Sequence, residues 1–200
     1  MIQTRPLLLA SASPRRREIL TRLGLVFTVE AADIDESRRD GEEPHAYVTR
    51  LAEEKVRAIA ERRAALDPRQ AVLGADTTVV VDGQVLNKPV DLAESEQMLR
   101  SLRGREHVVH TAVAVLLRPE LVLRLALVTT RVRFRDFSDA TLLGYVASGE
   151  GMDKAGSYGI QDLGAALVSE LHGSYTNVVG LPAAETLELL EALEVVESWP

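Results

Sequence analysis

The run of residues 71–82 constrains the fold of this chain more than any other segment. It consists almost entirely of apolar and β-branched residues, which predicts a strand. The Asp82-Gly83 pair that ends the run is typical of a tight hairpin turn, so residues 84–86 are expected to begin the return strand. We therefore expect a chain built around a β-sheet.

The rest of the chain alternates between segments typical of strands and segments typical of helices. Further strands are expected at residues 6–10, 26–30, 106–117, 121–134, 165–171 and 175–179. Helices are expected at residues 14–23, 44–65, 92–102 and 138–148, with a last one that begins at Pro182. Residues 33–43 and 149–164 have the composition of loops. Because strands and helices alternate and one or two hairpins are inserted, we predict the α/β class with a mixed sheet.

Length and composition are those of an ordinary globular protein. The chain has 200 residues, of which 46% are hydrophobic and 26% charged, and this length suits one domain of two lobes or two very small domains. No apolar run approaches the ~20 residues that a membrane helix needs. The basic residues 15–17 follow the apolar residues 7–10, the reverse of an export signal, and the lack of cysteine excludes disulfides and thiolate metal sites. We therefore expect a cytoplasmic protein with no membrane partner.

The distribution of charge favours a small anionic ligand over a nucleic acid. The net charge is −7 and the pI about 5.2, whereas general nucleic-acid binding needs a basic face. A small anion needs only a local basic pocket. Among the 23 lysines and arginines, lysine is kept only at positions 55, 88 and 154. Either codon bias explains this, or these positions need a compact point charge rather than the planar arginine fork.

The start of the first expected helix breaks a local rule of helix construction. Ser13 and Pro14 are an ordinary N-cap and first helical residue, but three consecutive arginines follow at residues 15–17. A helix N-terminus carries partial positive charge and favours acidic side chains there. Its free N–H groups bind anions, and arginines beside them would enlarge such a site to the size of a triphosphate. We therefore favour an anion site over a plain capped helix.

Carboxylates in two segments are candidates for chemistry. Asp76 interrupts an apolar strand, so it must meet a cation, a metal ion or hydrogen-bond donors, unless it reaches solvent at a strand end. Gly74 just before it suggests close approach by a ligand or by backbone. Lys88, soon after the hairpin, is a natural partner for Asp76 or for a phosphate. The acidic residues within 33–36 form either a solvated loop or a source of oxygen ligands for Mg²⁺ or Mn²⁺.

The glycine-rich segment of residues 153–161 also carries Lys154 and Gln161. It is either a mobile loop or a recognition loop, because the amide of Gln161 is able to read the edge of a base. His107 and His110 are expected on opposite faces of one strand, so no histidine metal site is predicted. No Ser-His-Asp or Walker-type spacing is present either.

Taken in order, five blocks of this sequence resemble the Maf family of nucleotide pyrophosphatases. The blocks are Leu-Ala-Ser-Ala-Ser-Pro-Arg-Arg at 9–16, Arg-Leu-Ala-Glu-Glu-Lys at 50–55, Gly-Ala-Asp-Thr at 74–77 with Leu-Asn-Lys-Pro at 86–89, Asp-Lys-Ala-Gly at 153–156 with Tyr-Gly-Ile-Gln at 158–161, and Gly-Ser-Tyr at 173–175 with Val-Val-Gly-Leu-Pro at 178–182. The resemblance spans residues 7–193. One block would be weak support, but five in the family's order form a specific match.

The resemblance implies both a fold and an activity. The fold would be a single Maf domain of residues 1–200, with an elongated mixed sheet, flanking helices and two lobes around a cleft, similar to the inosine-triphosphate pyrophosphatases. The protein would be a homodimer that uses Mg²⁺ or Mn²⁺ to hydrolyse a nucleoside triphosphate to the monophosphate and pyrophosphate. The Lys-Ala-Gly-x-Tyr-Gly-Ile-Gln pattern resembles the dTTP/UTP branch, although Asp162 stands where that branch commonly has Gly.

The resemblance also assigns roles to individual residues. It implies that Asp76 is the general base, that Asp76 and Glu36 hold the metal ion, and that water attacks the α-phosphorus. Lys55 and Lys88 would neutralise charge on the phosphates. The expected substrate-binding residues are Ser11, Ser13, Arg15, Arg16, Thr77 and Gln161, of which positions 15, 77 and 161 mark the subfamily.

Other functions stay open at this point. A pyrophosphatase for another nucleotide, such as 7-methyl-GTP or a modified pyrimidine nucleotide, would need the same residues around the phosphates. A non-catalytic, nucleotide-binding regulator of septum formation, the process that gives the family its name, is a second alternative. The paired carboxylates and the lysines argue against a purely binding role, because a binder of anions has no use for Asp76 beside the lysines.

Overall fold

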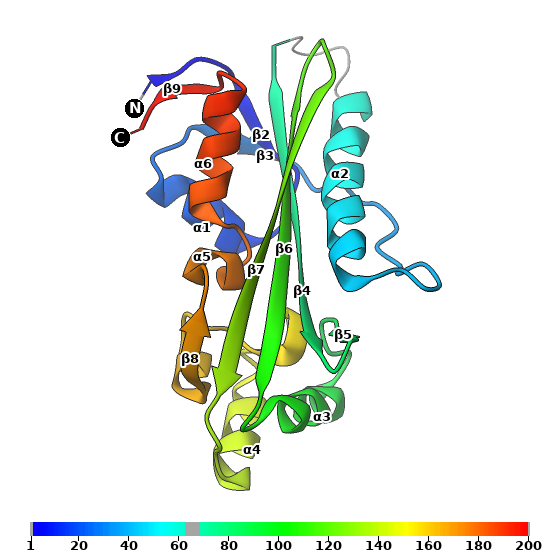
Figure 1. Ribbon diagram of the computed structural model, residues 1–200, viewed down its shortest axis with the longest axis vertical. Coiled ribbons are helices and arrows are strands. Elements are labelled where there is room, and N and C mark those ends of the chain that lie inside the picture. The colour runs from blue at the N-terminus through cyan, green and yellow to red at the C-terminus, as the bar shows by residue number, and fades with distance from the viewer. Residues whose placement is uncertain (1, 63–68, 200) are drawn as a thin grey trace. The chain divides into compact units, whose positions relative to one another are not determined.

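The computed structural model describes residues 2–62 and 69–199, and the chain divides into two compact units. Unit 1 comprises Met1–Asp76, Thr111–Val128 and Gly180–Pro200, and unit 2 comprises Thr77–His110 and Thr129–Val179. Three long strands contribute residues to both units: β4 (Ala71–Val81), β6 (Glu106–Leu117) and β7 (Val122–Phe134) (Figure 1).

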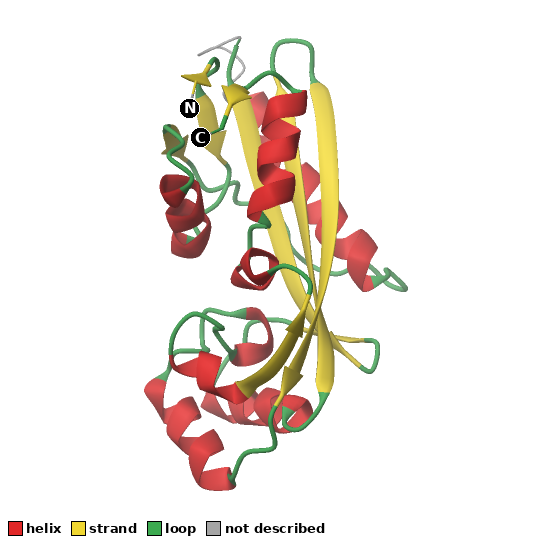
Figure 2. Cartoon of the chain, turned by 60° about the vertical axis from the view of Figure 1, so that its left-hand side comes forward, coloured by secondary structure: helices red, strands yellow, loops and turns green. Residues whose placement is uncertain are grey.

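Unit 1 places helices on both faces of its part of the sheet. Its helices are α1 (Pro14–Arg22), α2 (Pro44–Arg62) and α6 (Ala183–Ala192). Its shorter strands are β1 (Ile2–Gln3), β2 (Leu7–Leu9), β3 (Phe27–Val29) and β9 (Val196–Ser198). Within this unit α2 covers one face of the long strands and α6 lies over the opposite face (Figure 1 and Figure 2).

Unit 2 is built from short elements joined by turns. Its described helices are α3 (Leu92–Leu102), α4 (Asp139–Ser148) and α5 (Tyr175–Val179), with 3-10 turns η1 (Ala155–Ser157) and η2 (Leu163–Leu167). Its shorter strands are β5 (Gln84–Leu86) and β8 (Val168–His172). Helix α4 begins at the N-cap Ser138 and ends at Gly149, whose φ of 70° is the left-handed conformation that favours glycine. In the part of the chain that the structure describes, no helix is both long and apolar enough to span a membrane.

The main sheet is mixed, as predicted for the α/β class. Its strand order is β3-β2-β4-β6-β7-β8, and β5 pairs with β4 outside that path. Strand β2 runs parallel to β3 and β4, whereas β5 and β8 run antiparallel to β4 and β7. Strands β1 and β9 form a separate antiparallel pair, which the sequence did not predict because each has only two or three residues.

Helix α2 packs on the sheet through an apolar stripe at helical spacing. The buried members of the stripe are Tyr47, Val48, Leu51, Ala52, Val56 and Ile59. The helix lies so close to β4 that a Cβ at Gly74 would be 2.8 Å from Val56 Cγ1 and 3.1 Å from the Ala52 carbonyl oxygen. The close approach predicted at Gly74 is therefore confirmed, and helix α2 makes it.

We expect Gly74→Ala to lower the free energy of unfolding by about 1–3 kcal/mol, because the added methyl group overpacks the contact with α2. Urea denaturation measures this change. Gly144→Ala in α4 is the matched control, because a Cβ there meets nothing within 4 Å. Equal stability of the wild type and the Gly74 variant would show that α2 moves away at no cost.

Residues 175–179 form helix α5, so the strand predicted there is wrong. Ser174 starts the helix, because its Oγ accepts a hydrogen bond from the Asn177 N–H at 3.2 Å. The buried Asn177 side chain then donates to the Val109 carbonyl at 3.1 Å and to Thr130 Oγ1 at 2.9 Å. These bonds outweigh the strand preference of the β-branched residues in the segment.

The strand predicted at residues 165–171 is partly wrong as well. Leu163–Leu167 is the 3-10 turn η2, and strand β8 covers only Val168–His172. Helix α2 ends at Arg62, and residues 63–65, which were also predicted to be helical, lie outside the described residues. The other predicted elements agree with the structure to within one residue at each end.

An aromatic cluster around His107 forms part of the core of unit 2. His107 is 1% exposed, its Nε2 lies 2.8 Å from Tyr158 Oη, and its ring packs edge-on against Phe134 and Tyr158. Burial lowers the pKa of His107 to about 4. His110 lies on the same strand but is only partly buried, as expected for two residues on opposite faces.

This buried histidine predicts a loss of stability in mild acid. The unfolded chain takes up a proton at His107 near pH 6.5, but the folded chain does so only near pH 4. Stability is therefore fully present above pH 6.5 and falls by up to about 3 kcal/mol as the pH drops toward 4. Urea unfolding across this range should be less pH-dependent in His107→Gln than in the wild type or in the exposed control His45→Gln. Parallel profiles for all three proteins would contradict the prediction.

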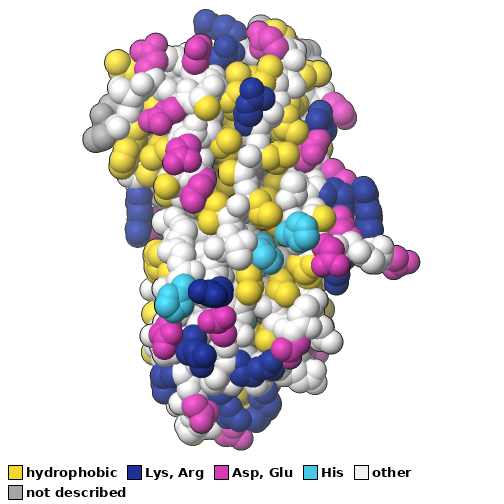
Figure 3. All heavy atoms as spheres, viewed as in Figure 1, with side chains coloured by type: hydrophobic (Ala, Val, Ile, Leu, Met, Phe, Trp, Pro, Cys, Tyr) yellow, Lys and Arg dark blue, Asp and Glu magenta, His cyan; other side chains and the backbone are white. Residues whose placement is uncertain are grey.

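The surface of unit 2 carries charges of both signs in mixed clusters. Asp139 Oδ1 accepts from Arg103 Nη1 at 2.5 Å and from Arg100 Nη1 at 3.1 Å, and Arg105 Nη2 donates to Asp82 at 2.6 Å. Figure 3 shows the two signs interspersed over the face that it displays. Exposed pairs of this kind contribute only about 0–1 kcal/mol each, so the packed core carries the stability of this unit.

Candidate active site

The turn between β2 and helix α1 has the form of an anion site. Ser13 is the N-cap of α1, and its Oγ accepts a hydrogen bond from the Arg16 N–H at 3.5 Å. Ser11 Oγ accepts from the Ser13 N–H and from Arg16 Nη1, each at 3.2 Å. The turn is thus held with the first N–H groups of the helix at the end of β2, an arrangement that binds phosphate oxygens.

Strand register brings this turn to the same end of the sheet as Asp76. Strands β2 and β4 are parallel with Leu9 beside Leu73, and the Ala10 N–H donates to the Leu73 carbonyl at 2.7 Å. Ser11 follows directly, and Asp76 lies three residues beyond Leu73 on β4. The turn therefore follows the carboxyl end of β2, the end at which ligands bind in α/β sheets, and Asp76 lies within β4 just beyond the point where β2 stops.

Arg16 is the buried cation of the turn. It is 9% exposed, and its Nε donates to the Gly180 carbonyl at 2.8 Å in addition to its bond within the turn. Burial lowers the pKa of Arg16, the charges of Asp76 and Glu36 raise it, and the charge of Arg15 lowers it, with a net lowering. The two arginines and the two carboxylates therefore act on a common region of unit 1.

Lys55 joins the two carboxylates. Its Nζ lies 2.6 Å from Asp76 Oδ1 and 2.8 Å from Glu36 Oε1. The Lys55 and Asp76 side chains are 9% and 11% exposed, whereas that of Glu36 is 54% exposed. One side of this cluster is therefore buried against the sheet and the other is open to a ligand.

Asp76 has the environment of a base. Burial raises the pKa of Asp76, and the positive charges of Lys55 and Arg16 oppose this shift without cancelling it. A carboxylate whose pKa is moved toward neutrality takes up a proton more readily than an exposed one does. Burial in contact with a specific charge partner is also the pattern found at functional sites.

A second group of residues holds the loop that carries Glu36. Tyr47 Oη donates to the Glu36 carbonyl at 2.8 Å, and Arg50 Nη2 donates to the Ser37 carbonyl at 3.1 Å. Arg50 also forms a two-point ion pair with Glu42, at 2.7 and 2.8 Å, which lowers the pKa of Glu42 to about 2. Sequence reasoning missed these residues, although Arg50 stands in one of the five blocks.

The whole-chain comparison now decides the family. Residues 6–193 match the family described as Maf-like protein. The chain belongs to the Maf family. Arg16, Lys55 and Asp76 come from three of the five blocks noted in the sequence, at 9–16, 50–55 and 74–77, and the Gly180 carbonyl that accepts from Arg16 belongs to the block at 178–182.

Curated relatives of this Maf chain are similar over almost their whole length. The dTTP/UTP pyrophosphatase of Myxococcus xanthus is 49% identical over 193 residues, covering 96% of this chain and 95% of the relative. That of Shewanella oneidensis is 50% identical over 195 residues, covering 95% and 99%. That of Escherichia coli is 50% identical over 184 residues, covering 92% and 91%.

Similarity to solved structures is weaker. A nucleoside-triphosphatase (dITP/XTP pyrophosphatase) from Mycobacterium abscessus has a TM-score of 0.40 and 17% identity, with 64% of this chain and 74% of that chain covered. The assignment to the Maf family therefore depends on the sequence matches.

Four of the predicted site residues lie outside the cluster described above. Arg15 is partly exposed beside Arg16, and Thr77 follows Asp76 along β4. Lys88 is exposed in the segment after β5, and Gln161 is partly exposed between η1 and η2. Thr77, Lys88 and Gln161 belong to unit 2. The ion partner of Asp76 within unit 1 is Lys55, and the role of Lys88 stays a prediction from the sequence.

The carboxylates of this Maf chain fit a divalent cation that also binds phosphate. Within residues 2–62 and 69–199, no group of three or more acidic or histidine side chains is placed to hold a metal ion. Asp76 and Glu36 nevertheless approach one point, where the Lys55 ammonium contacts both. Mg²⁺ commonly binds to one or two carboxylates plus substrate phosphates, so a two-carboxylate site suits it.

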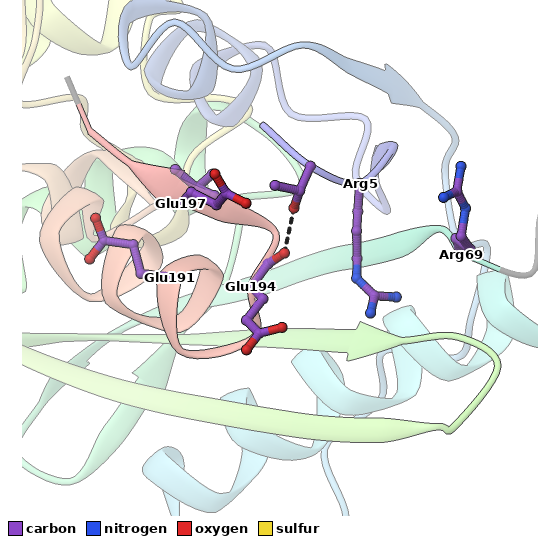
Figure 4. A pocket seen from close by; sticks show the side chains of 7 residues that line it. Arg5, Arg69, Glu191, Glu194 and Glu197 are labelled. Carbon is purple, nitrogen blue, oxygen red and sulfur yellow. Dashed lines mark hydrogen bonds between the residues drawn. The ribbon is translucent and has the colours of Figure 1, made fainter. Parts of the chain in front are cut away.

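Another hollow of unit 1 has the wrong charge for a polyanion. It has a volume of about 840 Å³ and is lined by Thr4, Arg5, Arg69, Glu191, Glu194, Val196 and Glu197. Figure 4 shows that its labelled side chains comprise three glutamates and two arginines, so acidic groups predominate. It contains none of the predicted site residues, and we do not place a triphosphate there.

Proposed function

We propose that this Maf-family chain hydrolyses nucleoside triphosphates, with dTTP and UTP as preferred substrates, to the monophosphate and pyrophosphate. One observation carries the proposal. The buried carboxylate of Asp76 forms an ion pair with Lys55 of helix α2 and also interacts with the charge of Arg16 at the start of helix α1. The names of the curated relatives, each a dTTP/UTP pyrophosphatase at about half identity, support the choice of substrate.

The cations of unit 1 would bind the phosphate chain. The N-terminal N–H groups of α1 and the Arg15 side chain would donate hydrogen bonds to phosphate oxygens, which binds the substrate and fixes its direction. Arg16 is held by Ser11 and Gly180, so its charge is already in position when the substrate arrives. Such preorganisation lowers the cost of stabilising charge in the transition state.

Asp76 would then accept the proton of the attacking water. As the water oxygen bonds to the α-phosphorus, its proton moves to Asp76 and pyrophosphate leaves with the electrons of the broken bond. Lys55 beside Asp76, and Lys88 on the phosphates, would offset the negative charge that spreads over the oxygens. Asp76 and Glu36 would hold Mg²⁺ or Mn²⁺, which when bound supplies further positive charge to the phosphates.

Thr77 and Gln161 would set the preference for the base. The Gln161 amide has one donor group and one acceptor oxygen, and these match the O4/N3 edge of uracil or thymine. Cytosine presents the opposite pattern at the same edge, so the amide would have to flip to bind it.

Two further properties stay predictions from the sequence. They are that the protein forms a homodimer and that it is cytoplasmic, where it would have access to the nucleotide pool.

A substrate panel tests the proposal. Turnover of dTTP, UTP, CTP and 7-methyl-GTP is measured side by side with Mg²⁺ and with Mn²⁺, with pyrophosphate as the detected product. We expect dTTP and UTP to give the highest kcat/KM. A preference for 7-methyl-GTP would identify that nucleotide, rather than dTTP or UTP, as the substrate. Binding of nucleotide without turnover would favour the alternative function of a non-catalytic regulator.

A further inference from the structure

The loop that carries Gln161 is closed by a single carboxylate. Glu150 follows helix α4, and its two oxygens accept hydrogen bonds from the backbone N–H groups of Leu163 at 2.8 Å and Gly164 at 3.0 Å. The same carboxylate accepts from Tyr145 Oη at 2.9 Å. Glu150 thus connects the end of α4 to the far end of the loop, because Leu163 lies thirteen residues further along the chain.

Tyr145 extends this connection to the near side of Gln161. Its hydroxyl oxygen accepts from the Gly159 N–H at 3.1 Å while its hydrogen is donated to Glu150. Tyr145 is 6% exposed, and burial raises its pKa well above the ordinary value, so the hydroxyl stays protonated. The Tyr145–Glu150 pair therefore holds backbone on both sides of Gln161.

The segment leaves little freedom between these points. Tyr158 and Ile160 are buried, and the Tyr158 hydroxyl lies 2.8 Å from His107. Gly164 is so close to Gly159 that a Cβ would lie 2.3 Å from the Gly159 carbonyl oxygen. Gln161, by contrast, is partly exposed, and among the described residues its amide forms no side-chain hydrogen bond. The backbone is therefore held on both sides of Gln161, while the amide of Gln161 is available to a ligand.

We propose that Tyr145 and Glu150 are positioning residues that fix the Gln161 amide and thereby set the enzyme's selectivity between uracil and cytosine. The inference rests on the proposed function, because it assigns a cause to the base preference. The bonds to Gly159, Leu163 and Gly164 fix the backbone from which the Gln161 side chain extends, and an amide whose backbone is fixed reaches the edge of a base at one position rather than at many. Neither residue is proposed to touch the substrate.

Two variants remove the connection in different ways. Tyr145→Phe keeps the ring and deletes the hydroxyl, which leaves the Gly159 N–H without its acceptor and removes one of the two hydrogen bonds to Glu150 Oε1. Glu150→Gln keeps the shape but replaces one acceptor oxygen with an NH₂ group, which faces an N–H donor in either orientation. The exposed Tyr175→Phe and Glu106→Gln are the matched controls.

The experiment measures kcat and KM for UTP and CTP, together with hydrogen exchange of the peptide that contains residues 158–164. We expect the UTP/CTP ratio of kcat/KM to fall on the order of tenfold in both variants, through a higher KM for UTP, with kcat for UTP within about threefold of wild type. Amide exchange at positions 159, 163 and 164 should be faster than in the wild type. The two controls should match the wild type in both measurements.

The outcomes separate this inference from the proposed function. An active Tyr145→Phe enzyme with an unchanged UTP/CTP ratio overturns the positioning role, even if its melting temperature falls. An equal loss of kcat on both nucleotides also overturns it, because that result indicates a purely structural role. A wild-type protein that hydrolyses no nucleoside triphosphate overturns the proposed function itself, and the selectivity role with it.

Discussion

Replacing Asp76 with asparagine is expected to lower kcat by about 10²–10⁴-fold, the usual effect of losing a general base. The amide cannot take the proton of the attacking water, but it occupies the same volume and its oxygen still accepts a hydrogen bond from Lys55 of α2. Lys55 also retains its contact with Glu36 at 2.8 Å. We therefore expect the fold to be preserved and the loss to fall on kcat more than on KM.

Steady-state kinetics with UTP at saturating concentration measure this effect. Asp136→Asn is the matched control, because it makes the same change at an exposed carboxylate and should keep wild-type turnover. Circular dichroism and urea unfolding show whether the Asp76 variant is folded. A folded variant that retains most of its turnover would remove Asp76 from the mechanism.

Removing the ammonium group of Lys55 is expected to have the largest effect on stability. Lys55→Met leaves Asp76 and Glu36 without the cation that contacts both, and breaking a buried ion pair in this way costs about 3–5 kcal/mol. Because Lys55 is the strongest influence that lowers the pKa of Asp76, its loss moves that pKa further up. A carboxyl group with a raised pKa in the folded state costs stability as the pH rises, so the destabilisation should be large at neutral pH and smaller in acid.

Urea denaturation of the wild type and of Lys55→Met at neutral pH and near pH 4.5 measures the change. The double variant Lys55→Met/Asp76→Asn should recover much of the lost stability, because it no longer buries an unpaired charge. Lys154→Met is a useful comparison, because the Lys154 side chain is 14% exposed but its carboxylate partner at 2.7 Å, Asp153, is exposed. If the stability of Lys55→Met equals that of the wild type at neutral pH, the ion pair does not organise the site.

Single residues that break a local rule led to the candidate site. Three arginines at a helix start and an acid in an apolar strand each conflict with local preference, and the structure buries Arg16 and Asp76 in unit 1, where their charges interact. Lys55 lies on the apolar stripe of α2, which is a third conflict of this kind. It pairs with Asp76, whereas Lys88, the partner suggested by its place after the hairpin, is exposed.

Features that depend on backbone placement could not be predicted. The sequence shows β-branched residues at 175–179, but the bonds of Ser174 and Asn177 make a helix there. Glu150 looks like any surface acid until two N–H groups of the same loop are seen to point at its carboxylate. Such contacts arise when the chain folds back on itself, so residue type alone does not predict them.

The most direct test of the central claim is the position of attack on the phosphate chain. Hydrolysis of UTP in water labelled with heavy oxygen, followed by mass spectrometry of the products, shows which phosphorus receives the label. The site described here predicts label in the uridine monophosphate and unlabelled pyrophosphate, because Asp76 directs water to the α-phosphorus. Label in pyrophosphate, or release of orthophosphate as the first product, would contradict the account.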